Sequence, residues 1–319
     1  MEKYSPLYKY GLALSVACLI AMLFIFLTQD NTDIPVLQKD RPVPSFSISG
    51  VQHPPKSQTL KVAVGAMISP RDTEIYYQQL LRSLGEAIGA NVELVQRKTY
   101  AEVNDLLISG VIDLAFICSG PYAIGTEQHA LPLLSTPEVQ GQHTYQSYLI
   151  VHKDSPIERL EDLRGKTFAF TDPDSNTGSL VPRYWLQQKG YTPERFFKET
   201  IFTYSHDNSI FAVAKGMVDG AAVDSLIWNF YQHNNSELTA KTRIIQESEA
   251  YGIPPVVASP TMPEERRSAI QRALLTMHET SSGKNILQKL LIDRFVLPQD
   301  QWYGSIRTMQ QTLMQAGQP

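Results

Sequence analysis

The stretch GKTFAFTDPDSNTGSLVPRYWLQQKG, residues 165–190, contains three different patterns in direct succession. Residues 165–170 are a short apolar run typical of a strand, and residues 180–190 have helical apolar spacing that ends at a glycine. Between them, residues 171–179 carry a dense set of oxygen-bearing side chains. A strand that leads through a polar loop into a helix is the repeating unit of an α/β protein.

The same alternation continues on both sides of this unit. Strand-like runs lie at 60–68, 91–96, 113–119, 200–205 and 219–223, and helix-like runs at 75–89, 100–110, 209–218 and 225–232. Strands that alternate with helices imply crossover connections and parallel strands covered on both faces. We therefore predict an α/β protein of two lobes with parallel-rich sheets flanked by helices. Lobe 1 is predicted to comprise residues 58–150 and 254–319, and lobe 2 residues 151–253.

An uncharged apolar run precedes this region at residues 11–28. At about 1.5 Å per residue it would span roughly 27 Å as a helix, close to the thickness of the bilayer hydrocarbon. Lys3 and Lys9 precede the run, so the positive-inside rule predicts that residues 1–10 are cytoplasmic. We expect an N-terminal transmembrane helix that anchors the protein to the cytoplasmic membrane and leaves the rest at its periplasmic, or extracytoplasmic, face.

Two alternatives to a permanent anchor remain open. The run could be a signal peptide that is cleaved, although no small-residue cleavage site follows it, or Cys18 within it could be lipidated. Residues 29–57 contain several prolines, and proline fixes φ and lacks a backbone donor. This segment is predicted to be an extended tether.

Composition and missing motifs exclude several classes of function. With a net charge of -4 and 43% hydrophobic residues, the chain suits a folded, mildly acidic protein and not one that binds nucleic acid. The two cysteines form no CxxC pair, so no metal site is expected from them. Sequence signatures of nucleophilic, zinc and nucleotide-dependent enzymes are absent as well. We expect a binding protein without catalytic residues, cofactor or metal.

Four polar loops are candidates for the binding site. They span residues 69–73, 118–122, 171–179 and 205–209, where predicted strands lead into helices. In open α/β sheets, ligands bind at this end of the strands, and unpaired N–H groups at helix starts favour an anion. A calcium loop is disfavoured because Thr177 stands where that motif needs glycine. An ordinary turn and helix cap remains the alternative for residues 171–179.

Two segments of the chain together resemble a known family. They are residues 162–186, DLRGKTFAFTDPDSNTGSLVPRYWL, and residues 204–228, YSHDNSIFAVAKGMVDGAAVDSLIW. They resemble the periplasmic phosphonate-, phosphite- and phosphate-binding proteins of ABC importers, which have the type II periplasmic binding fold. The resemblance implies a phosphorus oxyanion gripped by hydroxyls and backbone amides, and an ABC permease as partner. The residues that it places around the anion are Ser175, Asn176, Thr177, His206 and Asp224.

Asp224 bears on which anion is accepted. An ionised carboxylate only accepts hydrogen bonds, so it would accept the proton of a protonated phosphorus oxyanion and repel sulfate. Its position differs from that of the glutamate in aminoethylphosphonate-binding members, which favours a small oxyanion. The alternative is that Asp224 only caps the helix after it. Ser119, Tyr76 and Tyr122 are further candidate ligand contacts.

Cys118 leaves a second function open. It is either a buried apolar cysteine or, as in a branch of the family that resembles arsenite-responsive sensors, a metalloid ligand. The predicted function is a solute-binding protein that closes over its oxyanion at two chain crossings, near residues 147–155 and 248–259, and presents it to an ABC importer. The alternative is a membrane-tethered sensor of a phosphorus oxyanion or arsenite that signals in trans to a membrane kinase.

Overall fold

A computed structural model describes residues 46–48 and 59–317 of the chain. The predicted anchor at residues 11–28 and most of the predicted tether lie outside the described residues. Within the described part, no helix combines the length and apolar character needed to span a bilayer. Phe46–Ile48 form strand β1, which pairs antiparallel with a strand of the first sheet. The tether prediction is therefore wrong for these three residues, whose sequence FSI has no proline and alternates apolar with polar side chains.

The first sheet mixes parallel and antiparallel strands. Its strands are, in spatial order, β1 (Phe46–Ile48), β3 (Val92–Val95), β2 (Leu60–Val64), β4 (Leu114–Phe116), β13 (Val256–Ala258), β5 (Leu133–Glu138) and β14 (Arg294–Val296). Strand β2 runs parallel to β3 and β4, whereas β13 is antiparallel to β4 and β5. The predicted parallel pairing is thus confirmed for β3, β2 and β4. The prediction of a parallel-rich sheet is wrong, because four of the six pairings in this sheet are antiparallel.

The second sheet has the same mixed character. Its order is β11 (Thr242–Glu247), β7 (Ser147–His152), β10 (Gly220–Asp224), β8 (Thr167–Phe170) and β9 (Glu199–Phe202). Strands β10, β8 and β9 are parallel, and β7 is antiparallel to both β10 and β11. The carboxyl ends of β8, β9 and β10 therefore meet at one edge of the sheet.

A short two-stranded ladder lies where the chain passes between the two sheets. Strand β6 (Thr144–Tyr145) pairs antiparallel with β12 (Tyr251–Gly252). The chain enters the second sheet at Ser147, directly after β6, and leaves it after Glu247, shortly before β12. The lobe limit predicted at residues 150 and 151 falls inside β7, just beyond this transition.

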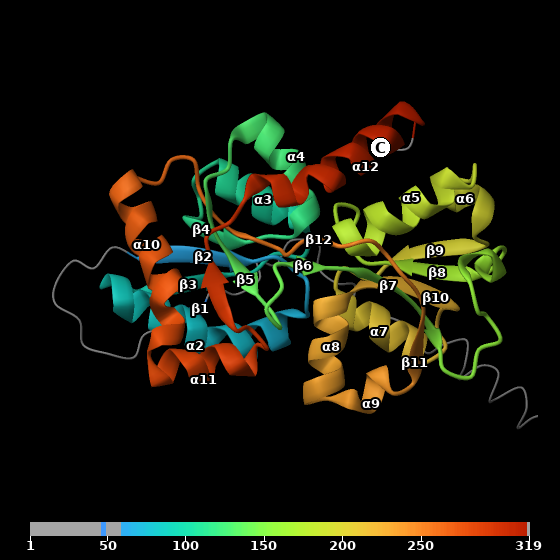
Figure 1. Cartoon of the computed structure of the whole chain (residues 1–319), viewed down its shortest axis with the longest axis horizontal. Helices are drawn as coiled ribbons and strands as arrows, with labels where there is room; N and C mark the ends of the chain where they lie inside the picture. Colours follow the sequence, from blue (N-terminus) through green and yellow to red (C-terminus); the bar gives the residue numbers. More distant parts are fainter. Residues whose placement is uncertain (1–45, 49–58, 318–319) are drawn as a thin grey trace, which may run out of the picture. The chain divides into compact units, whose positions relative to one another are not determined.

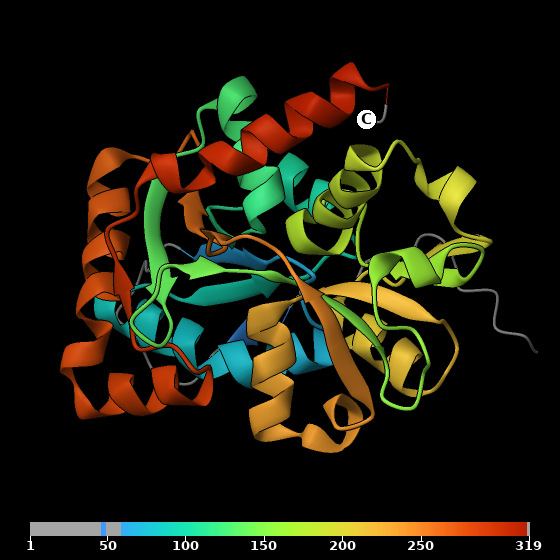
Figure 2. The ribbon, with the colours of Figure 1, turned by 45° about the vertical axis from the view of Figure 1, so that its right-hand side comes forward.

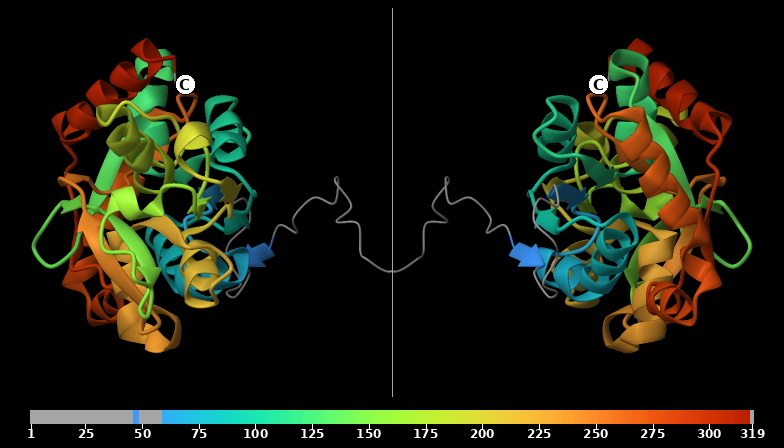
Figure 3. Two further views of the ribbon diagram at one scale, coloured as in Figure 1. Left: turned by 90° about the vertical axis from the view of Figure 1, so that its right-hand side faces the viewer. Right: turned by 90° about the vertical axis from the view of Figure 1, so that its left-hand side faces the viewer.

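Helices cover both faces of each sheet (Figures 1 and 3). Beside the first sheet are α2 (Pro70–Ile88), α3 (Tyr100–Ile108), α4 (Ser119–His129), α10 (Glu264–Thr276), α11 (Ser281–Lys289) and α12 (Gly304–Gln315). Beside the second are α5 (Val181–Gln188), α6 (Pro193–Phe196), α7 (His206–Ala214), α8 (Ser225–Asn234) and α9 (Ser236–Thr239). Helix α12 contacts both α4 and α5, as Figure 2 shows.

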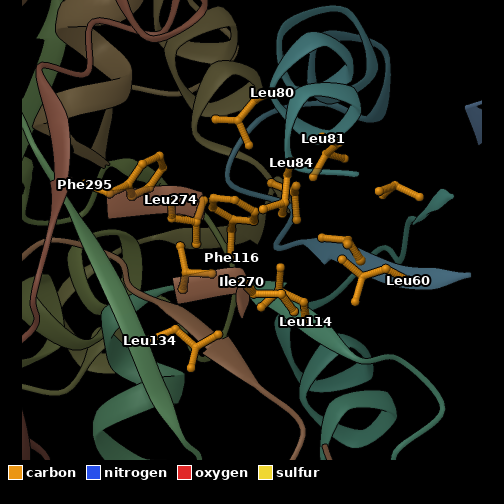
Figure 4. Packing of buried hydrophobic residues seen from close by; sticks show 14 of the residues in the cluster. Leu60, Leu80, Leu81, Leu84, Leu114, Phe116, Leu134, Ile270, Leu274 and Phe295 are labelled. Atoms are coloured by element: carbon orange, nitrogen blue, oxygen red, sulfur yellow. The ribbon is translucent and has the colours of Figure 1, made fainter. Parts of the chain in front are cut away.

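Alternation along β2 divides the first core into two layers. Val62 and Val64 face Leu84 of α2 and Ile270 of α10, in the layer shown in Figure 4. Ala63, between them, faces the opposite layer with α3, α4 and α12. Successive side chains of a strand point to opposite faces, so a short run that is apolar throughout is buried on both.

Candidate functional site

Three loops of the second sheet meet at the carboxyl edge of its parallel strands. After β8, the chain runs through residues 171–175 into a π-helical turn, Asn176–Leu180, and then into α5. After β9, it starts α7 at His206, and after β10 it starts α8 directly behind Asp224. Two of the four predicted loops, 171–179 and 205–209, therefore lie here, together with the predicted Asp224.

A tight turn fixes the first of these loops. The side chain of Ser175 accepts a hydrogen bond from the backbone N–H of Gly178, 3.0 Å away. A Cβ atom at Gly178 would lie 2.4 Å from Thr171 Oγ1. The helix-cap alternative is thus correct for Ser175, and the same turn leaves Asn176 and Thr177 fully buried. Single π-helical turns of this kind are frequent at functional sites.

Gly178→Ala is expected to destabilise this loop by roughly 1–3 kcal/mol, because the new methyl group would overlap Thr171. Gly304→Ala is the matched control, since a Cβ atom there meets nothing within 4 Å and the backbone is helical. Thermal unfolding of the two variants measures the difference. Equal melting temperatures would show that the close packing at Gly178 does not contribute to the stability of the protein.

Buried polar atoms without a hydrogen-bond partner gather at these helix starts. In the described part of the chain there are ten such side-chain atoms, and five of them belong to residues 176–179 and 205–206. They are Asn176 Oδ1, Thr177 Oγ1, Ser179 Oγ, Ser205 Oγ and His206 Nε2. Proteins satisfy about nine in ten buried polar groups, so this concentration indicates a place built for a polar ligand.

His206 is held in one tautomer. Its Nδ1 accepts a hydrogen bond from the backbone N–H of Asp224 at 3.1 Å, so the ring proton belongs on Nε2. The side chain is fully buried, and burial lowers its pKa to about 3. The ring is therefore neutral at pH 7, and its partnerless Nε2–H is a fixed hydrogen-bond donor.

Asp224 both caps a helix and lines a cleft. Its Oδ1 accepts the backbone N–H of Leu226 at 2.7 Å and that of Ile227 at 3.3 Å, which is the capping role of the alternative interpretation. Its side chain also faces the cleft described below. Burial raises the pKa of this carboxyl to about 7, although the two backbone N–H groups oppose the shift. Asp224 is therefore able to accept or donate a proton near neutral pH.

Groups from outside the second sheet complete the surroundings of this cluster. The phenol of Tyr145, which ends β6, accepts a hydrogen bond from the side-chain amide of Asn176 at 3.2 Å. Tyr100, which begins α3, has a buried hydroxyl without a partner. Burial raises the pKa of Tyr100, and nearby Cys118, Asp172 and Asp224 raise it further.

Direct contacts join the two halves around the cluster. The backbone N–H of Tyr100 donates to Asp172 Oδ2 at 3.1 Å, and that of His206 donates to the carbonyl of Met67 at 2.9 Å. A Cβ atom at Gly120 would lie 2.5 Å from the carbonyl oxygen of Asp174. The polar cluster is thus enclosed by elements of both sheets.

The remaining candidates take different positions. Ser119 Oγ donates to the carbonyl of Gly252 at 2.6 Å, and Tyr122 donates to Asp300 while its ring packs against Tyr303. Both are buried and neither lines the cleft, so the structure brings neither side chain into the cleft.

Cys118 is buried beside the cluster. Burial raises the pKa of its thiol to about 12, although hydrogen bonds from the backbone N–H groups of Asn176 and Gly120 oppose the shift. The thiol is therefore protonated at neutral pH. Tyr76, by contrast, lines the cleft, with its ring packed edge-on against Phe230.

Two residues of the site, Tyr100 and Tyr145, were not predicted from the sequence. Tyr100 starts the helix that follows parallel strand β3, so the rule that selected the other loops would also have selected this one. Tyr145 has no comparable signal, because its position depends on the passage of the chain between the two sheets.

A cleft of about 310 Å³ borders the cluster and is lined by residues of both sheets. Two α/β units joined at a two-stranded ladder, with polar helix starts facing inward beside a cleft, define the class of two-lobed solute-binding proteins. A family model described as "ABC transporter, phosphonate, periplasmic substrate-binding protein" matches residues 62–303, most of the chain. The chain belongs to this family, which places it on the extracytoplasmic side.

Two curated relatives are similar to this chain in sequence. The chain is 32% identical over 184 residues to the phosphate-import protein PhnD of Mycolicibacterium smegmatis, which covers 53% of this chain and 56% of that protein. It is 25% identical over 255 residues to the phosphonates-binding periplasmic protein of Escherichia coli, covering 77% of this chain and 75% of that protein. The matched stretch thus spans little more than half the length of the mycobacterial relative.

Solved structures show the same fold. The binding protein component of an ABC phosphonate transporter from Pseudomonas aeruginosa has a TM-score of 0.76 at 21% identity, covering 80% of this chain and 86% of its own. A protein of Prochlorococcus marinus in complex with methylphosphonate has a TM-score of 0.72 at 19% identity, covering 82% and 99%. The predicted two-lobed type II periplasmic binding fold is confirmed. The comparisons lend no support to the sensor alternative.

Proposed function

We propose that this protein binds a phosphorus oxyanion, that is phosphate, phosphite or a phosphonate, between its two lobes and presents it to an ABC permease. The observation that carries the proposal is the partnerless Nε2–H of neutral His206, buried together with the partnerless hydroxyl of Thr177. Donors buried without partners are costly unless a ligand satisfies them. A helix start adds backbone N–H groups that favour an anion.

Asp224 supplies the selectivity in this proposal. A phosphorus oxyanion that retains a proton donates it to the ionised carboxylate, or accepts a proton from the neutral form. Sulfate has no proton at neutral pH and is repelled by an ionised Asp224. The carboxyl therefore matches an anion that shares one proton with the protein.

Calorimetric titration of the purified full chain, stripped of bound ligand, tests the proposal. We expect phosphate, phosphite or methylphosphonate to bind at pH 7 and sulfate to bind much more weakly. Thr177→Ala is expected to weaken binding of the phosphorus ligand, because it removes a buried hydroxyl from the cluster. Binding of arsenite alone, lost in Cys118→Ser, would contradict the proposal, as would the absence of any binding.

Closure is proposed to be held by a contact outside the anion cluster. The hydroxyl of Tyr231 on α8 donates a hydrogen bond to Asp72 on α2. Tyr231→Phe is expected to weaken ligand affinity by roughly ten- to a hundredfold, because a hydrogen bond to a charged group contributes about 1.5–3 kcal/mol. The loss should appear mainly as faster ligand dissociation in stopped-flow measurements.

Tyr184→Phe on α5, away from the α2–α8 contact, is the matched control for this variant. Its dissociation rate should equal that of the unaltered protein. Equal rates in all three proteins would show that the Tyr231 contact does not hold the closed state.

Residues 11–28 are proposed to anchor the protein in the membrane. The intact mass of the protein purified from membranes distinguishes the three possibilities for this segment. A full-length mass supports the anchor. A mass that lacks the N-terminus indicates a signal peptide, and a diacylglycerol adduct on Cys18 indicates a lipoprotein; either would overturn the anchor.

A further inference from the structure

The wall of the cleft is mostly apolar. Of the side chains that line it, the large aromatic and aliphatic ones come from both lobes and include Tyr76, Tyr77, Tyr148, Ile227, Phe230 and Leu291. An inorganic oxyanion needs polar donors and makes no use of such a surface. The cleft therefore has a chemistry different from that of the buried cluster beside it.

The cleft adjoins the polar cluster at three residues. Met67, Tyr145 and Asp224 line the cleft, and each is hydrogen-bonded to the cluster. The carbonyl of Met67 accepts the N–H of His206, the phenol of Tyr145 binds the amide of Asn176, and the N–H of Asp224 donates to His206 Nδ1. A ligand whose phosphorus end binds the cluster therefore has space for its substituent beyond Asp224, in the adjoining cleft.

Size and charge limit what the cleft accepts. Its volume of about 310 Å³ exceeds the cavity of about 150 Å³ that holds benzene in an apolar protein interior. Among the Asp, Glu, Lys, Arg and His side chains of the described chain, Asp224 alone lines it. In the proposed function the carboxyl of Asp224 is engaged by the phosphorus end of the ligand. A charged substituent would then leave water without finding an opposite charge in the cleft.

We propose that the ligand is an organophosphonate or phosphate monoester with an uncharged, largely apolar substituent of up to about the size of an aromatic ring. Its phosphorus end binds the buried cluster, and its substituent occupies the apolar cleft. This inference rests on the proposed function and narrows it from phosphorus oxyanions in general to those that carry an organic group.

Titration of the full chain with phosphate, methylphosphonate, butylphosphonate, phenylphosphonate and 2-aminoethylphosphonate tests the inference. Burial of each methylene contributes about 0.8 kcal/mol, or roughly fourfold in affinity. We expect butyl- and phenylphosphonate to bind at least about tenfold tighter than methylphosphonate. 2-Aminoethylphosphonate should bind no tighter than methylphosphonate.

The outcomes separate this inference from the proposed function. Binding of phosphate or methylphosphonate with no gain for the larger ligands overturns the inference and leaves the proposed function intact. Tighter binding of 2-aminoethylphosphonate than of butylphosphonate also overturns it, because the cleft would then favour a cation. If none of the ligands binds, both proposals fail.

A variant that fills the cleft provides the second test. Ile227→Trp is expected to weaken the affinity for phenylphosphonate by at least about tenfold. It should change the affinity for methylphosphonate by less than about twofold. Leu226→Trp, at the neighbouring cleft position, serves the same purpose if Ile227→Trp does not fold. Val111→Trp, whose side chain is 51% exposed outside the cleft, is the control and should change neither. Equal losses for both ligands would overturn the inference.

Discussion

Asp224→Asn is expected to raise the affinity for sulfate by tenfold or more at pH 8, a gain of about 1.4 kcal/mol or more. At this pH the carboxyl of Asp224 is mostly ionised, since its pKa is raised to about 7, and it repels a fully ionised anion. Asparagine removes the charge and adds an amide donor, while its carbonyl oxygen still caps α8. Calorimetric titration with sulfate and methylphosphonate measures the change in selectivity. Sulfate affinity equal to that of the unaltered protein would contradict the role of Asp224.

The same substitution is expected to change how the stability of the unliganded protein depends on pH. Burial raises the pKa of Asp224 from 3.8 to about 7 in the folded state, so the folded protein keeps this proton between about pH 4 and pH 7 while the unfolded chain loses it. The contribution of Asp224 is therefore fully present below about pH 4 and is lost as the pH rises through about 7. At about 1.36 kcal/mol per pH unit the loss is on the order of 4 kcal/mol.

Urea unfolding at pH 5 and pH 7.5 measures this dependence. Asp224→Asn should lose less stability over the interval than the unaltered protein does. Glu86→Gln is the control, because that side chain is exposed on α2 and its substitution should leave the dependence unchanged. An identical pH dependence in all three proteins would show that Asp224 is not the buried titrating group.

His206→Ala is expected to weaken the affinity for phosphorus oxyanions by roughly ten- to a hundredfold. The variant removes the Nε2–H donor, and a hydrogen bond to a charged group contributes about 1.5–3 kcal/mol. The contribution should not change between pH 6 and pH 8, since burial lowers the pKa of His206 to about 3 and the ring stays neutral. Titrations at both pH values measure the loss.

His278→Ala is the matched control for this variant. His278 also has a buried ring nitrogen without a partner, but it lies in the short helix Met277–Glu279 of the first lobe, outside the polar cluster. Its substitution should leave affinity unchanged. A comparable loss in His278→Ala, or none in His206→Ala, would show that the His206 ring does not bind the ligand.

Local patterns in the sequence predict most of the second lobe. The strand, loop and helix of residues 165–190 form as expected, since β8 ends at Phe170 and α5 ends at Gln188. The polar loops meet because parallel strands end at the same edge of a sheet, which is a local rule. Asp224 caps α8, as one interpretation of the sequence predicts, and it also lines the cleft, while its contact with the anion stays a prediction.

Contacts between distant segments could not be predicted in this way. A short apolar run has the same pattern in a parallel and an antiparallel strand. The sequence therefore does not indicate that β7 and β13 run antiparallel to their neighbours. Tyr145 reaches Asn176 only because the chain passes between the sheets at β6. Tyr122 resembles a ligand contact by its place at a helix start, yet its side chain packs against Tyr303.

A crystal structure of the full chain grown with methylphosphonate would test the central claim most directly. We expect the phosphonate oxygens within hydrogen-bond distance of His206 Nε2 and Thr177 Oγ1, with one oxygen facing the carboxyl of Asp224. A phosphonate bound elsewhere, with these three groups still lacking a ligand partner at saturating concentration, would contradict the account.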